Sequence, residues 1–190
     1  MSPLVLASSS PRRLQLLQRL GVEPARVASP AIDETPLKAE LPRAYALRLA
    51  LAKAQAVARA PDEIVLAGDT TVALGRRILP PADTEAIQRD LLGKLSGRRH
   101  HVLSAVCVID ATGTARTRIA DTIVAFKPLS PAEIDAYIAG GEGLGKAGGY
   151  AVQGYAEAFV RFLAGSHSGV IGLPLFETRA LLRTAGVPLA

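Results

Sequence analysis

The pattern of apolar and polar positions predicts a chain in which strands and helices alternate. Short runs of buried, often β-branched residues predict strands, and longer Ala/Leu-rich runs with polar residues on one side predict helices. The expected strands cover residues 4–7, 63–67, 72–74, 102–109, 116–126 and about 158–163. The expected helices cover residues 11–20, 43–60, 83–95, 130–139 and about 173–184.

Turn and capping residues mark where these elements begin and end. Ser10 followed by Pro11 is typical of a helix start, and Gly21 suits the left-handed position at a helix end. Asp83 is a candidate cap for the third helix. Ser130 followed by Glu133 has the spacing of a capping box.

The order of elements favours one α/β domain over residues 1–190, built on a mixed sheet flanked by helices. The run Asp110-Ala111-Thr112-Gly113 between two strand patterns predicts an antiparallel hairpin, so the sheet is not purely parallel. Two lobes around a cleft are one arrangement compatible with this order.

Composition narrows the class of protein. The 190 residues are 49% hydrophobic and 21% charged, which is enough to bury a core and too apolar for a disordered chain. No apolar run approaches the roughly 18 residues that span a bilayer, and 3–7 is too short for a signal peptide. Cys107 is the one cysteine, so no internal disulfide is possible. We therefore expect a cytoplasmic protein that does not associate with membranes.

The net charge of +5 favours an anionic partner. The basic residues occur in short pairs such as Arg12-Arg13 and Arg98-Arg99, and aromatic residues make up only 4% of the chain. Proteins that bind single-stranded nucleic acid combine a basic groove with aromatic stacking platforms. A small polyanion is therefore expected rather than a nucleic acid.

Two segments are candidates for chemistry. Ser8 to Arg13 combines hydroxyl groups, a helix start and two guanidinium groups, which is typical of a phosphate-binding loop but also of an ordinary capped helix. Asp69, after an apolar run, is predicted at a strand end, where ligands of open α/β sheets gather. It could bind Mg²⁺ or act as a base, or it could form a turn with its own backbone.

A third candidate is the glycine-rich stretch 140–154. Gly140 and Gly145-Lys146 match the first part of a nucleotide-binding P-loop. Ala147 stands where that loop needs Ser or Thr, and the stretch follows a predicted helix instead of a strand, which excludes the P-loop. A segment that closes over a ligand with Glu142, Lys146 and Gln153 remains possible.

Together these segments resemble the Maf family of nucleoside triphosphate pyrophosphatases. The resemblance is carried by 6–13, Ile32-Asp33-Glu34, Leu51-Ala52-Lys53-Ala54, Gly68-Asp69-Thr70, 145–154 and Gly172-Leu173-Pro174-Leu175. It implies an elongated mixed α/β fold of the inosine triphosphatase type with a central cleft, commonly as a homodimer. It also implies Mg²⁺- or Mn²⁺-dependent hydrolysis of a nucleoside triphosphate to the monophosphate and pyrophosphate.

The resemblance assigns expected roles to individual residues. Asp69 is the expected general base and, with Glu34, the expected metal ligand. The expected phosphate clamp is Arg12, Arg13, Lys53 and Lys146. The residues expected to read the base or ribose are Ser8, Ser10, Arg12, Thr70 and Gln153. The second arginine after Ser-Pro, Arg13, together with Thr70 and the pair Lys146 and Gln153, resembles the branch that acts on dTTP and UTP. Modified pyrimidine nucleotides are further candidates, and cleansing of the nucleotide pool is the expected role.

One position departs from the family pattern. Relatives commonly carry a lysine shortly after the Asp-Thr strand, whereas this chain has Pro81 at the end of Ile78-Leu79-Pro80-Pro81. If that lysine binds phosphate, either Arg76, Arg77 or Lys94 replaces it or turnover is lower. The alternative interpretation is a non-catalytic regulator of cell division that binds nucleotides or nucleic acid.

Overall fold

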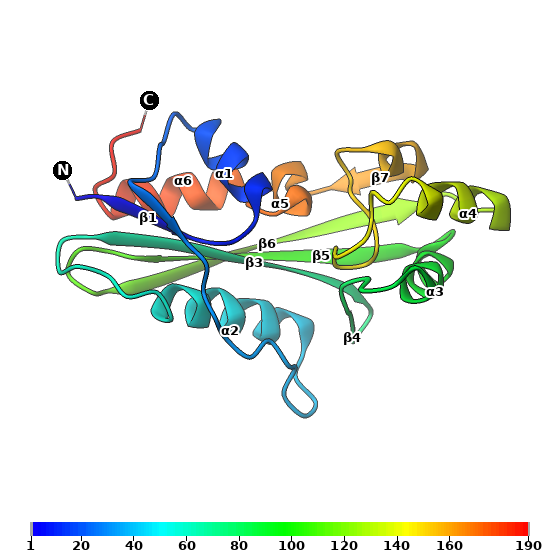
Figure 1. Cartoon of the computed structure of the whole chain (residues 1–190), viewed down its shortest axis with the longest axis horizontal. Coiled ribbons are helices and arrows are strands. Elements are labelled where there is room, and N and C mark those ends of the chain that lie inside the picture. The colour runs from blue at the N-terminus through cyan, green and yellow to red at the C-terminus, as the bar shows by residue number, and fades with distance from the viewer. Residues whose placement is uncertain (1, 190) are drawn as a thin grey trace.

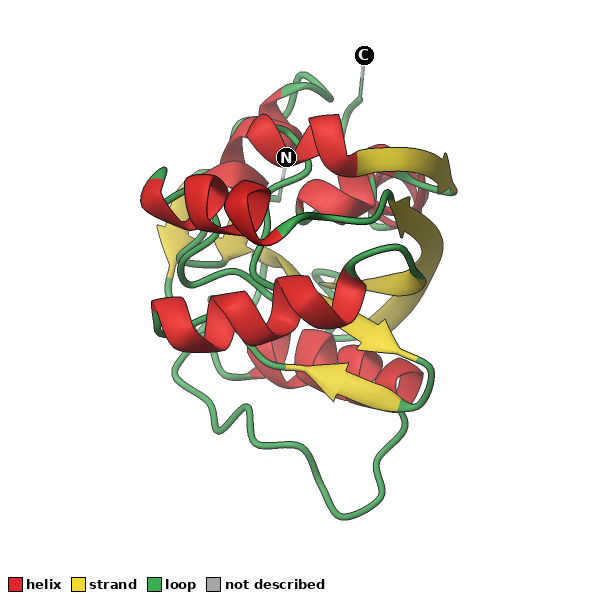
Figure 2. Cartoon of the chain, turned by 90° about the vertical axis from the view of Figure 1, so that its right-hand side faces the viewer, coloured by secondary structure: helices red, strands yellow, loops and turns green. Residues whose placement is uncertain are grey.

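The computed structural model describes residues 2–189 as an elongated open sheet with helices on both faces (Figures 1 and 2). The strands are β1 (Leu4–Ala7), β2 (Arg26–Ala28), β3 (Ile64–Leu74), β4 (Arg77–Leu79), β5 (Arg99–Ile109), β6 (Ala115–Phe126) and β7 (Val160–Ala164). The helices are α1 (Pro11–Gln18), α2 (Pro42–Gln55), α3 (Glu85–Leu95), α4 (Pro131–Ala139), α5 (His167–Ile171) and α6 (Leu175–Thr184), with a 3-10 helix η1 (Tyr155–Phe159).

The strand order is β2-β1-β3-β5-β6-β7, and β4 pairs with the far end of β3. Strands β2, β1 and β3 run parallel to one another, whereas β5 is antiparallel to β3, β6 to β5 and β7 to β6. This confirms the predicted mixed sheet and the predicted hairpin between β5 and β6. Within residues 2–189 no helix is long and apolar enough to cross a membrane.

Side-chain alternation along the strands builds one core on each face of the sheet. Leu4 and Leu6 join the larger core, which packs against α1, α3, α4 and α6. Val5 and Ala7 point the other way, into a smaller core of mostly small residues beneath α2. Figure 1 shows α2 on one face and α1 with α6 on the other. Because alanines dominate that face of α2, the helix lies close to the sheet.

The structure differs from the predicted elements at several places. The expected strands 63–67 and 72–74 are one continuous strand, β3, because hydrogen bonds to β5 run through Gly68 to Thr71. Helix α2 ends at Gln55 and not at residue 60, and Arg59, beyond its end, donates to carbonyls of the following turn. The short elements β2, β4 and α5 were not predicted, and each has only three to five residues.

The predicted caps have mixed outcomes. The Ser130–Glu133 capping box and the positive φ of Gly21 are confirmed. Thr84, not Asp83, caps α3 by accepting a hydrogen bond from the amide of Ile87. Ser10 occupies the N-cap position of α1 without a side-chain capping bond. The hydroxyl oxygen that accepts in this loop belongs to Ser8 instead, at 3.1 Å from the Ser10 nitrogen.

Candidate active site

The site lies where β1 ends and its neighbour β3 continues. Residues 4–7 of β1 pair with 64–67 of β3. That edge of β3 then has no partner strand from Gly68 to Thr71, before β4 pairs with Val72–Leu74. The chain leaves β1 through Ser8 into α1 at this point. The prediction that Asp69 follows a strand end was wrong for its own strand, because Asp69 pairs with Ala105 inside β3. The strand that ends beside it is β1.

Alternation along β3 directs successive side chains to opposite faces of the sheet. Asp69 and Thr71 point toward α2, where Asp69 contacts Lys53. Thr70 points to the other face, and its hydroxyl donates to the Gly172 carbonyl at 3.3 Å. Since β1 does not cover this stretch, one cavity can reach side chains from both faces.

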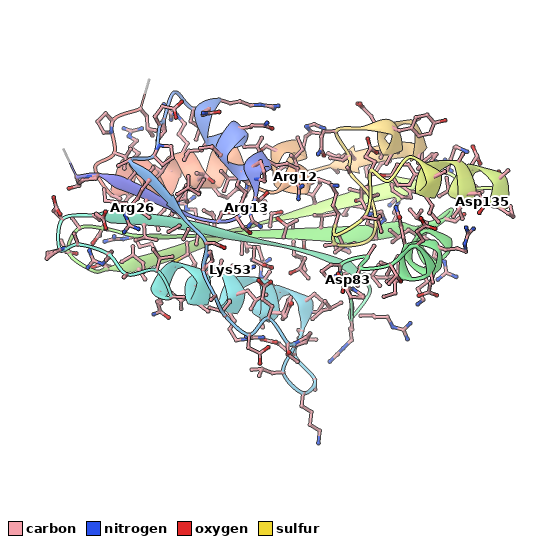
Figure 3. The ribbon with its side chains drawn as sticks, in the orientation of Figure 1. Arg12, Arg13, Arg26, Lys53, Asp83 and Asp135 are labelled. Atoms are coloured by element: carbon pink, nitrogen blue, oxygen red, sulfur yellow. The ribbon has the colours of Figure 1, made fainter. Side chains whose placement is uncertain are left out.

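This cavity brings together nine of the ten predicted site residues. Its lining includes Ser10, Arg12, Arg13, Glu34, Lys53, Asp69, Thr70, Lys146 and Gln153. Figure 3 shows Arg12 and Arg13 on one side of the sheet and Lys53 on the other. Ser8 is buried and does not line the cavity; its contacts are with the loop that enters α1. An adjoining cavity on the α2 side shares Asp69 and Thr70.

An ion-pair cluster of buried Lys53 and Asp69 with exposed Glu34 orients Asp69. The Lys53 Nζ donates to Asp69 Oδ1 at 2.8 Å and to Glu34 Oε2 at 2.9 Å. The Thr71 hydroxyl donates to the other carboxylate oxygen, Oδ2, at 2.9 Å. Lys53 is 7% exposed and Asp69 is 5% exposed, so water screens their attraction little. Thr71 was not predicted as a site residue. On a continuous strand, a residue two positions after Asp69 points to the same face, and that spacing would have indicated Thr71.

Arg13 is held by backbone and side-chain acceptors that aim its guanidinium into the cavity. Its Nε donates to the Gly172 carbonyl at 2.9 Å, and Nη1 donates to Ser8 Oγ at 3.3 Å. Burial lowers the pKa of Arg13, while the nearby Asp69 opposes this effect. An arginine remains protonated even so, and Arg13, which lines the cavity, keeps N–H donors that these two bonds do not use. Ser8 therefore acts here as a support for Arg13.

Lys146 brings a further cation to the cavity from the glycine-rich stretch. Its Nζ donates to the Glu142 carbonyl. Burial lowers the pKa of Lys146 and the neighbouring Arg12 lowers it further, whereas Glu142 raises it. Arg12 and Lys146 therefore place two neighbouring cations in the lining of this cavity, which favours a polyanionic ligand.

The glycine-rich stretch is attached to the loop that follows β4. The Gly145 amide donates to the Ala82 carbonyl at 2.9 Å, and the Ala82 amide donates to the Lys146 carbonyl at 3.1 Å. The Gly148 amide donates to the Pro80 carbonyl at 3.3 Å. This pairing places Pro81 in the cavity wall beside Ala147.

Comparison with known proteins identifies the family. The family model described as Maf-like protein matches residues 3–185. The chain belongs to the Maf family. This Maf chain is 71% identical over 190 residues to a dTTP/UTP pyrophosphatase of Sphingopyxis alaskensis, covering 100% of both chains. It is 63% identical over 185 residues to a dTTP/UTP pyrophosphatase of Novosphingobium aromaticivorans, covering 97% of this chain and 92% of the relative.

A solved structure with a lower similarity is the nucleoside-triphosphatase, dITP/XTP pyrophosphatase, of Mycobacterium abscessus. The two chains are 16% identical, and the match covers 65% of the Maf chain and 72% of the solved chain, with a TM-score of 0.39.

Proposed function

We propose that this Maf protein hydrolyses nucleoside triphosphates, with dTTP and UTP as preferred substrates, to the monophosphate and pyrophosphate. The observation that carries the proposal is the cavity in which Asp69 lies among Arg12, Arg13, Lys53 and Lys146. The two relatives are named dTTP/UTP pyrophosphatases, which supports the same substrates for this chain. Turnover of damaged or modified pyrimidine nucleotides would give the protein a role in cleansing the nucleotide pool.

The cationic side chains address the main barrier to this reaction. A triphosphate carries several negative charges, which repel an attacking oxygen unless they are neutralised. Arg12, Arg13 and Lys146 supply donors on one side of the cavity. Arg13 is already fixed by Gly172 and Ser8, so little of its side-chain freedom is lost when phosphate binds.

Asp69 is the proposed general base. It accepts a proton from a water molecule while the water oxygen forms a bond to the α-phosphorus. The bond between that phosphorus and the α–β bridging oxygen breaks, and pyrophosphate leaves with the bonding electrons. Lys53 and Thr71 hold the two carboxylate oxygens in place before substrate arrives.

The residues present fit a divalent ion that binds together with substrate. Glu34 and Asp69 converge on one point, which the Lys53 ammonium occupies. Within residues 2–189 no group of three or more His, Cys, Asp or Glu side chains could hold a metal by itself. Mg²⁺ commonly binds through one or two carboxylates plus substrate phosphates. When bound, such an ion would neutralise phosphate charge and lower the pKa of water.

Replacing Lys53 with methionine is expected to raise the affinity of the nucleotide-free protein for Mn²⁺ by about tenfold or more, because an ammonium no longer competes for the two carboxylates. Electron paramagnetic resonance of free Mn²⁺ during titration measures this. Lys38→Met removes an exposed lysine from the loop that carries Glu34 and is the control. Equal Mn²⁺ affinities of Lys53→Met and the wild type would contradict the view that the metal ion and the Lys53 ammonium compete for Glu34 and Asp69.

Specificity for the base is assigned to hydrogen-bonding groups in the same cavity. Thymine and uracil present two carbonyl acceptors and one N–H donor along the same edge, and an amide such as Gln153 can complement part of it. Ser10, Thr70 and Arg12 offer further donors from α1 and β3. Because the 5-methyl group lies off this edge, dTTP and UTP are recognised alike.

Pyrophosphate release from each of the eight common nucleoside triphosphates, with and without Mg²⁺, tests the function. The expected result is Mg²⁺-dependent release that is fastest with dTTP and UTP. The alternative, a regulator of cell division, predicts no cleavage together with DNA or RNA binding that weakens steeply with salt. Either no cleavage or cleavage without base preference would overturn the proposal.

We also propose that the protein is a cytoplasmic homodimer. Sedimentation velocity tests the number of chains in the assembly.

Pro81 gives a separate prediction about the rate. Because Pro81 lies in the cavity wall, Pro81→Lys adds a cation there and is expected to raise kcat/KM for dTTP by about tenfold. The control is Thr117→Lys, which adds the same charge on the exposed part of β6. Steady-state kinetics at fixed Mg²⁺ compare the two variants. An unchanged kcat/KM in Pro81→Lys would show that the existing cations already saturate the phosphate contacts.

A further inference from the structure

Gln88 on α3 is a fully buried polar residue that lies outside the cavity. Its exposed fraction is 0%, and neither cavity around Asp69 includes it. The side-chain Nε2 donates to the carbonyl of Gly149 at 3.0 Å, while Oε1 has no hydrogen-bond partner within residues 2–189. A buried side-chain amide costs free energy wherever one of its polar atoms lacks a hydrogen bond, as Oε1 does here. The position therefore calls for a functional reason.

The hydrogen bond closes a tight turn that carries Lys146. The Lys146 amide donates to Gly143, and the Gly149 amide donates back to the Lys146 carbonyl. Both ends of this 143–149 turn meet Gln88. A Cβ on Gly143 would lie 2.1 Å from the Gly149 oxygen and 2.2 Å from Gln88 Nε2, so only glycine fits there. Gln88 thus holds the two ends of this turn, in addition to the backbone hydrogen bonds that join its middle to the loop after β4.

We propose that Gln88 is a positioning residue, which holds the 143–149 turn so that Lys146 can contact the polyphosphate of the substrate. This inference rests on the proposed function and deepens it, because it assigns control of one phosphate contact to α3. The coupling is specific to Lys146, since Asp69, Lys53 and Arg13 are held by other residues.

Two variants test the hydrogen bond at nearly constant volume. Gln88→Leu removes the donor to the Gly149 carbonyl. Gln88→Glu replaces that donor with a carboxylate oxygen, which repels the carbonyl oxygen. The control is Thr178→Val, which changes another fully buried polar residue, on α6. Binding of the α,β-imido analogue of dUTP with Mg²⁺, measured by calorimetry, reports the contact without turnover. We expect about tenfold weaker binding in both Gln88 variants and unchanged binding in Thr178→Val.

A double-mutant cycle with Lys146→Met separates positioning from general destabilisation. If Gln88 acts through Lys146, Gln88→Leu weakens binding no further once Lys146 is methionine. Additive losses, or normal binding in Gln88→Leu while Lys146→Met binds weakly, would overturn the inference and leave the proposed function standing. If Lys146→Met binds the analogue as the wild type does, both the inference and the assigned role of Lys146 are wrong. Hydrogen exchange that quickens only in 143–149 would support the inference further.

Discussion

Asp69→Asn is expected to lower kcat for dTTP by about a thousandfold or more, because the variant keeps the shape of the side chain but removes the proton acceptor. It also leaves the buried Lys53 ammonium with Glu34 as its one carboxylate partner. Single-turnover measurement of pyrophosphate release at saturating substrate isolates the chemical step. Binding of dTTP, measured separately, is expected to remain within about tenfold of the wild type, since Arg12, Arg13 and Lys146 are unchanged.

Asp110→Asn is the matched control for this variant. Like Asp69, Asp110 is a buried aspartate with a cationic partner, in this case Arg116. It lies away from the cavity, in the turn between β5 and β6. Its replacement is expected to lower the melting temperature without changing kcat. Near-normal turnover in Asp69→Asn would remove Asp69 from the role of base. Equal losses of kcat in both variants would show that the effect comes from destabilisation.

Arg13→Lys is expected to lower kcat/KM for dTTP by about a hundredfold, although the charge is kept. The guanidinium uses Nε for Gly172 and Nη1 for Ser8, which leaves its other N–H groups for the ligand. A lysine ammonium has no planar set of donors and cannot make both supporting contacts and a bidentate phosphate contact.

Arg19→Lys on the exposed end of the same helix is the control and is expected to match the wild type. Steady-state kinetics over a range of ionic strength make the comparison. If Arg13→Lys retains most of the wild-type kcat/KM, the contribution of Arg13 is its charge alone, and the hydrogen bonds to Gly172 and Ser8 have no catalytic purpose.

The difference between the predicted and observed β3 shows why local patterns fail at this site. Gly68-Asp69-Thr70-Thr71 has the composition of a turn, so the sequence indicates two short strands around it. Pairing with β5 supplies backbone partners through the whole segment, and burial on both faces holds it extended. Such long-range pairing is not visible in a window of neighbouring residues.

Other parts of the site could be predicted only as separate pieces. Lys53 was expected on a helix and Glu34 in an acidic loop, but nothing local showed that both carboxylates would converge on the lysine. Gln88 gave no signal in sequence, because a glutamine within a helix ordinarily lies at the surface. Its role depends on a contact with Gly149, 61 positions away.

The amino-acid sequence alone determined the class of fold, the hairpin of β5 and β6, the family and the kinds of side chain that serve its chemistry. These follow from periodicity, turn composition and short motifs, all of which act between residues close along the chain. Only the tertiary structure decided that Asp69 lies within a strand, that Ser8 supports Arg13, and that one cavity reaches both faces of the sheet. Those outcomes depend on where β1 stops beside β3, and strand pairing between distant segments decides that.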